Sequence, residues 1–351
     1  MTKLTQKESL SIRYVQGICI VAVVLSHYPI RPLDVFWPFI FHMPMFFLLG
    51  GLLYKRKSII KTCKDVAIKH LFYLTYTYVI ISLIATFLSS RYGINVGKIY
   101  PENFIYSFNW AIEKNFHNNA FFLVAWFLFA YAFVTLLCRV ILIIPSKLIL
   151  FAIAIVIGYI GMNYIAPLYK ETKIQHFNLL SQIFVGSMFY ILGFVFKKHL
   201  LSVRSIYIPL VAVAVLFTLK SQKLLFGMGM SWSDYHPEFY LHMLSTVLSI
   251  VSIFVITNIL SDLNIRYDFL SDVGKYSKEI MSYHLLSFFT VDWIFYKFGM
   301  YDISKAQALS HFNTPLYWYC YGIAGVLLPI ISFSLIRHFK MQFLSNRESN
   351  A

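Results

Sequence analysis

The chain has 351 residues, of which 59% are hydrophobic and only 13% are charged, and its mean hydropathy is +0.67. A water-soluble domain of this composition would expose large apolar patches, so the sequence predicts a polytopic membrane protein. The net charge of +15 would suggest a nucleic-acid partner for a soluble protein. Here the basic residues fall mostly between apolar segments, which favours membrane topology and lipid head groups and excludes nucleic acid.

Apolar runs of about 20 residues match a hydrocarbon core about 30 Å thick, and they must be helical because lipid satisfies no backbone polar group. Ten such runs are expected at about 12–30, 36–54, 68–89, 119–138, 140–162, 179–197, 203–219, 238–260, 274–296 and 315–338. Only Arg139 separates the fourth run from the fifth, so another count stays open there. The prediction is an all-α, polytopic membrane helical bundle of about ten transmembrane helices, forming one domain over residues 1–351.

The basic residues predict the orientation of the chain. With the N-terminus inside, two thirds of the 30 Lys and Arg residues fall on the inner side. The positive-inside rule therefore favours two cytoplasmic termini, in agreement with an even number of spans.

Several kinds of site are excluded by what the sequence lacks. The four cysteines form no C-x-x-C, which argues against a disulfide framework. The sequence also has no H-E-x-x-H, no Walker loop and no G-x-S-x-G. We therefore expect no metal site, no ATP-driven pump and no α/β-hydrolase.

The stretch from Arg13 to Lys57 carries the main functional candidates. It predicts a pair of membrane helices, the first with Arg13 near its start and His27 near its end, and the second opening at His42. Ionisable groups in hydrocarbon are costly, so each is a candidate functional residue. The 14 residues from Arg13 to His27 correspond to about 21 Å of helix, which places the two histidines together toward the outer side. The alternative is a histidine that only hydrogen-bonds a backbone carbonyl within the bundle.

The second helix of this pair ends in a basic patch. Lys55, Arg56 and Lys57 lie on the predicted inner side, where they would hold lipid phosphate or the phosphates of a nucleotide-type donor. A plain topology signal explains the same charges. The preceding Gly50-Gly51 permits either close helix approach or room around a ligand.

Later segments contribute further candidates. Trp126 is expected in the middle of a span, and Lys275, Lys278, Glu279, Tyr283 and His284 open another, where Lys278 and Glu279 would balance each other. Asn258, His242 and Asp292 are single polar residues typical of contacts between helices. Aromatic residues in the predicted outer loops fit either an interfacial belt or a platform for a sugar or lipid head group.

Four elements together resemble one family. These are the stretch from Gln16 to Ser26-His27, the stretch Phe41-His42-Met43-Pro44-Met45-Phe46-Phe47 with Gly50-Gly51, Trp126-Phe127-Leu128, and Gly274 to Ile280 with His284. This set is similar to the integral-membrane acyltransferase-3 family, and in particular to its fucose 4-O-acetylase-like branch. Gln16 stands where the family usually has a basic residue, with Arg13 one turn earlier, and Gly50 replaces the usual serine.

The resemblance implies transfer of an acyl group, usually acetyl, from cytoplasmic acyl-CoA to a hydroxyl of a surface glycan or its lipid-linked precursor. It implies His27 as catalytic base or acyl relay with His42, and a substrate site of Arg13, Trp126, Lys275, Tyr283 and His284. It also implies Lys55, Arg56 and Lys57 on the donor, no permanently bound cofactor, and the inner membrane of a bacterium. A polysaccharide exporter without chemistry and a non-catalytic assembly partner remain as alternatives.

Overall fold

The computed structural model describes residues 4–29, 37–263, 268–312 and 315–349, and within these ranges it contains helices and no β-strand. The predicted all-α fold is therefore confirmed for this part of the chain. The α-helices are α1 Gln6–Ser26, α2 His42–Leu52, α3 Ile59–Val66, α4 Tyr73–Tyr92, α5 Ser107–Glu113, α6 Ala125–Ile141, α7 Lys147–Ile160, α8 Ala166–Thr172, α9 Gln175–Ser202, α10 Tyr207–Ser221, α11 Phe239–Asp262, α12 Asp268–Lys275, α13 Ser277–Lys297 and α14 Trp318–Ser349. The π-helices η3 Ala67–Phe72 and η6 Gly161–Ile165 join α3 to α4 and α7 to α8.

Each predicted apolar segment overlaps a helix, but the number of membrane crossings is not confirmed as ten. Six helical runs among the described residues are long and apolar enough to cross: Gln6–Ser26, Ile59–Tyr92, Lys147–Thr172, Gln175–Ser202, Phe239–Asp262 and Trp318–Lys340. The other segments fall on the shorter apolar helices α2, α6 and α10, and on α13. A membrane protein is therefore supported, whereas ten crossings and the cytoplasmic termini stay predictions.

Helix α1 begins at a capping box, in which the Thr5 side chain accepts from the backbone N–H of Glu8 and the Glu8 carboxylate accepts from that of Thr5. It packs against α11, α12 and α13. The contact with α12 is close, because a Cβ added at Gly274 would lie 2.0 Å from the carbonyl oxygen of Arg13. Only glycine fits at this crossing.

Helices α2 and α9 cross through a pair of glycines. A Cβ at Gly51 would lie 1.7 Å from the carbonyl oxygen of Tyr190, and a Cβ at Gly193 would lie 2.0 Å from that of Leu48. Small residues let helix backbones approach closely in a membrane protein. The predicted close approach at the glycine pair of α2 is thus confirmed at Gly51.

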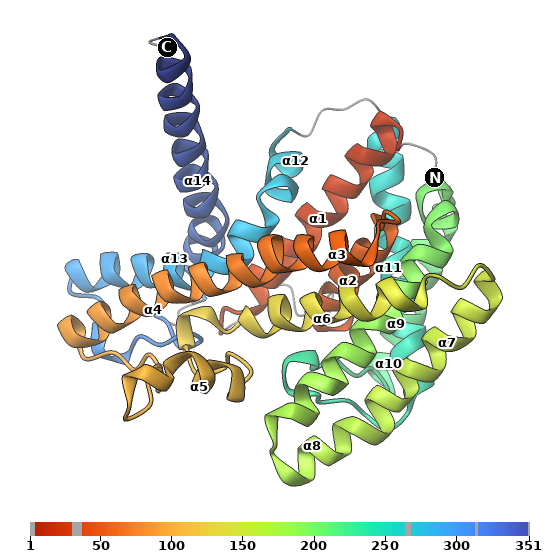
Figure 1. The fold of residues 1–351 in the computed structure, drawn as a ribbon, viewed down its shortest axis with the longest axis horizontal. Helices are drawn as coiled ribbons and strands as arrows, with labels where there is room; N and C mark the ends of the chain where they lie inside the picture. Colours follow the sequence, from red (N-terminus) through yellow and green to blue (C-terminus); the bar gives the residue numbers. More distant parts are fainter. Residues whose placement is uncertain (1–3, 30–36, 264–267, 313–314, 350–351) are drawn as a thin grey trace.

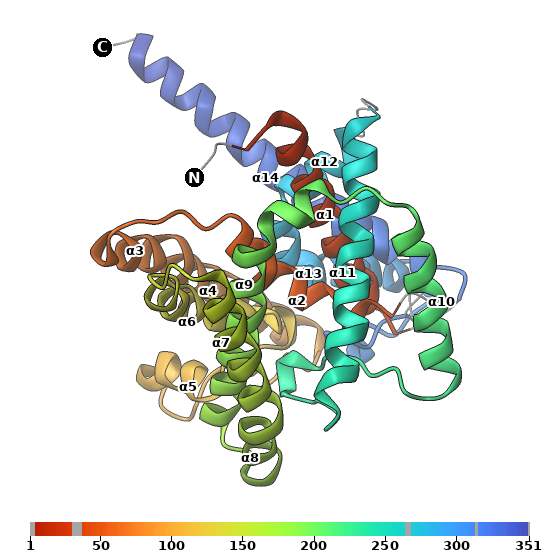
Figure 2. The ribbon, with the colours of Figure 1, turned by 90° about the vertical axis from the view of Figure 1, so that its right-hand side faces the viewer.

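The two views of the ribbon show how these contacts arrange the bundle. Helix α10 lies beside α11, and α7 lies beside α9, while α14 runs away from the other helices toward the C-terminus (Figures 1 and 2). Helix α1 contacts both α2 and α13, and its C-terminal end meets the first half of α13 at His27 and His284. The candidate histidines are located in this region.

Candidate active site

His27 and His284 form the centre of the site. Helix α1 ends at Ser26, and the next residue, His27, has Nδ1 2.8 Å from the carbonyl oxygen of Val23. His284 lies about two turns into α13 and has Nδ1 2.9 Å from the carbonyl oxygen of Met281. Its Nε2 is 3.3 Å from Nδ1 of His27, and the ring centres are 5.0 Å apart. The structure thus joins two histidines that are 257 positions apart in the chain.

These hydrogen bonds assign the protons of the two neutral rings. A carbonyl oxygen only accepts, so Nδ1 of each imidazole carries the proton. Nε2 of His284 then presents a lone pair, which accepts a share of the Nδ1–H of His27. In this arrangement Nε2 of His27 is the unprotonated nitrogen of that ring, which is the state that a general base requires.

His42 lies at the start of α2 and is buried. Its Nδ1 is 2.5 Å from the carbonyl oxygen of Pro38, and its ring packs edge-on against Phe39 at 5.2 Å. Helices α1 and α2 contact each other, so the hairpin histidines lie on neighbouring helices. His27 forms a hydrogen bond with His284 of α13.

A cavity of about 390 Å³ lies next to this region. It is lined by α1, α2 and the segment after it, α3, η3, α6, α9 and α13. Met281 lines the cavity and its carbonyl oxygen accepts from His284, so the cavity ends one helical turn from the histidine pair. Gly50 also lines it, and a Cβ there would lie 2.2 Å from the hydroxyl of Tyr131. Gly50 is therefore in close contact with Tyr131 at the cavity wall, and the predicted room around a ligand stays a prediction.

The cavity is basic. Its lining includes the four lysines Lys55, Lys57, Lys69 and Lys278, together with His70 and a single carboxylate, Asp65. Asp65 pairs with Lys57, and it also pairs with Lys69 at 3.0 Å. Lys278 donates to the carbonyl oxygen of Lys69 at 2.9 Å. The positive charges outnumber the negative one, so the cavity favours an anionic ligand.

Arg56 and Arg13 do not line this cavity. Both side chains are exposed. One turn beyond Arg13, Gln16 does line it, which places this neutral side chain where the resemblance expects a basic one. Among the predicted donor residues, Lys55 and Lys57 line the cavity and Arg56 does not.

Three further predicted substrate residues lie outside the cavity. Trp126 is the second residue of α6, not a mid-span residue as predicted, and it packs edge-on against Phe127, which does line the cavity. Tyr283 packs against Phe333, with ring centres 5.1 Å apart. Lys275 is exposed, with Nζ 5.2 Å from the ring centre of Tyr276.

Lys278 and Glu279 each make a further contact, in addition to their expected balance. Glu279 pairs with Arg337 of α14 at 2.7 Å. Lys278 places Nζ 3.4 Å from the ring centre of Tyr73. Consecutive helical residues point about 100° apart, so Lys278 is directed toward the cavity and Glu279 toward α14.

Sequence reasoning missed the role of Asp292, which it treated as a simple contact between helices. The buried carboxylate accepts from Nδ1 of His311 at 2.7 Å, from the hydroxyl of Tyr321 at 2.7 Å and from the backbone N–H of Phe312 at 3.1 Å. The hydroxyl of Tyr28, the residue after His27, donates to the carbonyl oxygen of Phe312 at 2.9 Å. This set, the Asp292 network, ties the end of α1 to α13, α14 and the loop between them. An acidic residue in an apolar segment was the signal available.

Arg139 was also read only as a break between two spans. Its side chain is buried at the end of α6, and Nε donates to the carbonyl oxygen of Lys57 at 2.7 Å. It therefore holds the basic segment after α2 against α6 at the mouth of the cavity.

The predicted outer aromatics engage neighbours in the same loops. The ring of Trp110 lies 4.4 Å from Nζ of Lys114, and that of Trp232 lies 4.1 Å from the ring of His117. Burial lowers the pKa of His117 to about 4. These contacts stabilise the loops and leave both readings of the aromatics, belt or platform, open.

Comparison with known proteins identifies the family. The sequence profile described as "Acyltransferase domain" matches residues 9–333. The chain belongs to this acyltransferase-3 family. No curated protein and no solved structure matches the chain. Family membership supports a membrane acyltransferase, and the matched range contains both histidines of the central pair and every residue that lines the basic cavity.

Proposed function

We propose that the protein is a membrane O-acyltransferase that moves an acyl group, acetyl in the simplest case, from cytoplasmic acyl-CoA to a sugar hydroxyl of a surface polysaccharide or its lipid-linked precursor. The observation that carries this proposal is the His27–His284 pair at one helical turn from a basic cavity. The histidine pair offers a base, and the lysines of the cavity offer positive charge for phosphates.

In this proposal the basic cavity takes the donor. The phosphates of acyl-CoA lie among Lys55, Lys57, Lys69 and Lys278, because cations and hydrogen-bond donors stabilise phosphate oxygens. The thioester then extends past Gly50 toward Met281. This path shortens the distance that the acyl group must cover between the two sides of the membrane.

The chemical step is one acyl transfer. Nε2 of His27 removes the proton of the acceptor hydroxyl as that oxygen attacks the thioester carbonyl carbon. The C–O ester bond forms, the C–S bond breaks, and the thiolate of CoA leaves and takes up a proton. His284 orients His27 through the Nδ1–Nε2 contact and so holds the reactive tautomer in place.

The proposal includes an orientation and a location. Both termini face the cytoplasm of a bacterium, residues 1–351 form one domain in its inner membrane, and about ten helices cross. The cavity then opens toward the cytoplasmic acyl-CoA pool, and no cofactor stays bound between turnovers.

The experiment follows labelled acetyl-CoA into envelope glycan in cells that carry the wild-type protein, His27→Ala or no protein. Wild-type cells should yield labelled ester that is absent from the other two. Transfer by His27→Ala at the wild-type rate would overturn the proposed mechanism. Loss of all surface glycan in the deletion, and not of its ester groups alone, would point to the exporter alternative.

A further inference from the structure

A second concave site lies on a different part of the bundle. It is a groove of about 590 Å³ between α7, α9 and α11, and almost all of its surface is apolar. Phe151 and Ile155 of α7, Leu192 of α9, and Val247 and Val251 of α11 contribute to its walls. This volume lies within the range of small-ligand sites. The shape and chemistry fit one hydrocarbon chain.

A histidine and a lysine lie at one end of the groove. His199 lines it there. Phe196 joins this histidine to α7, since its ring centre lies 6.3 Å from that of His199 and 5.8 Å from that of Phe151. Lys147 is one turn before Phe151 on α7, and its Nζ lies 3.4 Å from the carbonyl oxygen of Val195 on α9. Lys147 and His199 therefore flank the same end.

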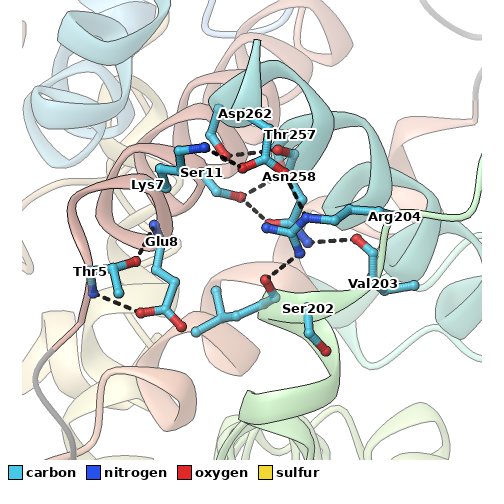
Figure 3. Close-up of polar contacts among 12 residues, drawn as sticks. Thr5, Lys7, Glu8, Ser11, Ser202, Val203, Arg204, Thr257, Asn258 and Asp262 are labelled. Carbon is cyan, nitrogen blue, oxygen red and sulfur yellow. Dashed lines mark hydrogen bonds and ion pairs between the residues drawn. The ribbon is translucent and has the colours of Figure 1, made fainter. Parts of the chain in front are cut away.

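Asp262 of α11 is paired with two other cations. Val203 lines the groove, and the next residue, Arg204, pairs with Asp262 at 2.6 Å. Figure 3 shows Lys7 approaching the same carboxylate, at 3.2 Å. One carboxylate thus faces two cations. Among the ion pairs of the described residues none involves Lys147, so this end of the groove keeps a positive charge.

We propose that the groove binds an anionic phospholipid, with one acyl chain along the apolar walls and the phosphate group between Lys147 and His199. Basic pockets between membrane helices bind anionic head groups, and an acyl chain adds hydrophobic binding along its length. In the orientation proposed above this end faces the cytoplasmic leaflet, which carries anionic lipids. The site is separate from the donor cavity and does not depend on the acyltransferase mechanism.

The charge, and not the apolar wall, makes the proposal specific. Any phospholipid can place a chain against apolar helices, but only one with net negative charge compensates Lys147. A preference for anionic over zwitterionic lipid with identical chains is therefore the property to measure.

The test uses the purified full chain in detergent, titrated with phosphatidylglycerol or with phosphatidylcholine of the same chains, and counts bound lipid by native mass spectrometry. The wild type should bind phosphatidylglycerol about fivefold more tightly, as expected for about one surface cation. Lys147→Gln should lose this preference and keep the binding of phosphatidylcholine. Lys173→Gln, at an exposed position outside the groove, is the matched control and should keep the preference.

A second variant tests the groove itself. Val247 is 42% exposed, so Val247→Trp can fill the groove without entering the core, and it should weaken binding of both lipids. Val213→Trp, 51% exposed on α10 and outside the groove, should leave binding unchanged. Equal binding of both lipids by the wild type would overturn the proposal. Tighter binding of a polyisoprenyl phosphate than of phosphatidylglycerol would also overturn it, in favour of a lipid-linked acceptor.

Discussion

Nε2 of His284 lies 3.3 Å from Nδ1 of His27. This hydrogen bond joins the residue that follows α1 to a residue inside α13. Because Nε2 of His284 accepts from Nδ1 of His27, losing either ring removes this contact, and the two rings should act as a unit. The first prediction follows from this coupling.

His27→Asn should lower the rate of acyl transfer about 10²–10⁴-fold, because it removes the proposed general base. His284→Asn should lower it less, since the base remains but its orientation is lost. The double variant should be no slower than His27→Asn, because residues that act as a unit are not additive. Initial rates of purified variants with acyl-CoA and acceptor measure this, with thermal unfolding as the control. Losses that multiply in the double variant would show two independent roles.

If the basic cavity binds the donor as proposed, substitutions of Lys278 and Lys275 should have different effects. Lys278→Gln should raise the KM for acyl-CoA about fivefold, because the cavity loses one cation near the phosphates. Lys275→Gln should leave KM unchanged, since that side chain is exposed outside the cavity. Steady-state kinetics with varied acyl-CoA distinguishes the two. An equal rise in KM for both variants would place the donor elsewhere.

Two adjacent glycines should respond differently to the same substitution. Gly51→Ala places a Cβ against the backbone of α9 and should destabilise the fold by about 2 kcal/mol or more. Gly50→Ala meets the movable end of Tyr131 inside the cavity, so it should change the KM for acyl-CoA more than the unfolding temperature. Thermal unfolding in detergent and donor kinetics check both statements. The assignment fails if Gly50→Ala is the more destabilising change.

The Asp292 network predicts a large loss of stability from one substitution. Asp292→Leu leaves His311 and Tyr321 buried without their acceptor, which should cost about 3–5 kcal/mol. Asp292→Asn keeps an acceptor oxygen and should cost less. Tyr28→Phe removes the hydrogen bond to Phe312 and should lower activity more than stability, because Tyr28 follows His27 directly. Unfolding midpoints with initial rates measure the series, and an unchanged midpoint for Asp292→Leu would contradict it.

His117 predicts a pH dependence. Its pKa of about 4 in the folded state lies below its ordinary value of 6.5, so the unfolded chain binds the proton first as the pH falls. This contribution to stability is complete above about pH 6.5 and is lost as the pH falls toward 4, by about 3 kcal/mol. The free energy of unfolding of the wild type and of His117→Gln, measured at pH 7 and at pH 4.5, isolates the contribution of His117. Parallel pH profiles for the two proteins would exclude this role.

Much of the fold was readable from hydropathy, because lipid requires long apolar helices. A helix lies on each of the ten predicted segments, but their lengths follow local contacts, so α2 ends after 11 residues where it crosses α9. The number of crossings therefore could not be taken from the apolar runs alone.

The sequence predicted individual residues of the candidate site, but it did not predict which of them lie together. The motifs around His27 and His42 pointed to them, and the late segment pointed to His284, yet no local pattern links positions 257 apart. Arg13 and Gln16 are three residues apart and so lie on one side of α1, yet Arg13 is exposed and Gln16 lines the cavity. The packing of α1 against its neighbours decides this, and the local sequence does not show it. The hydrogen bond of Asp292 could not be predicted, because its partner His311 lies in a loop without a recognisable sequence pattern.

The Asp292 network has a consequence for how the protein is made. Every residue that lines the basic cavity precedes Ser282 in the chain, whereas the contacts that hold Tyr28 come from Phe312 and Tyr321. We therefore expect a nascent chain whose last helix is still in the ribosome to assemble the cavity before it can fix the end of α1 that carries His27. Under the proposed function, a truncation before Tyr321 should give an inserted protein that holds donor without transferring its acyl group.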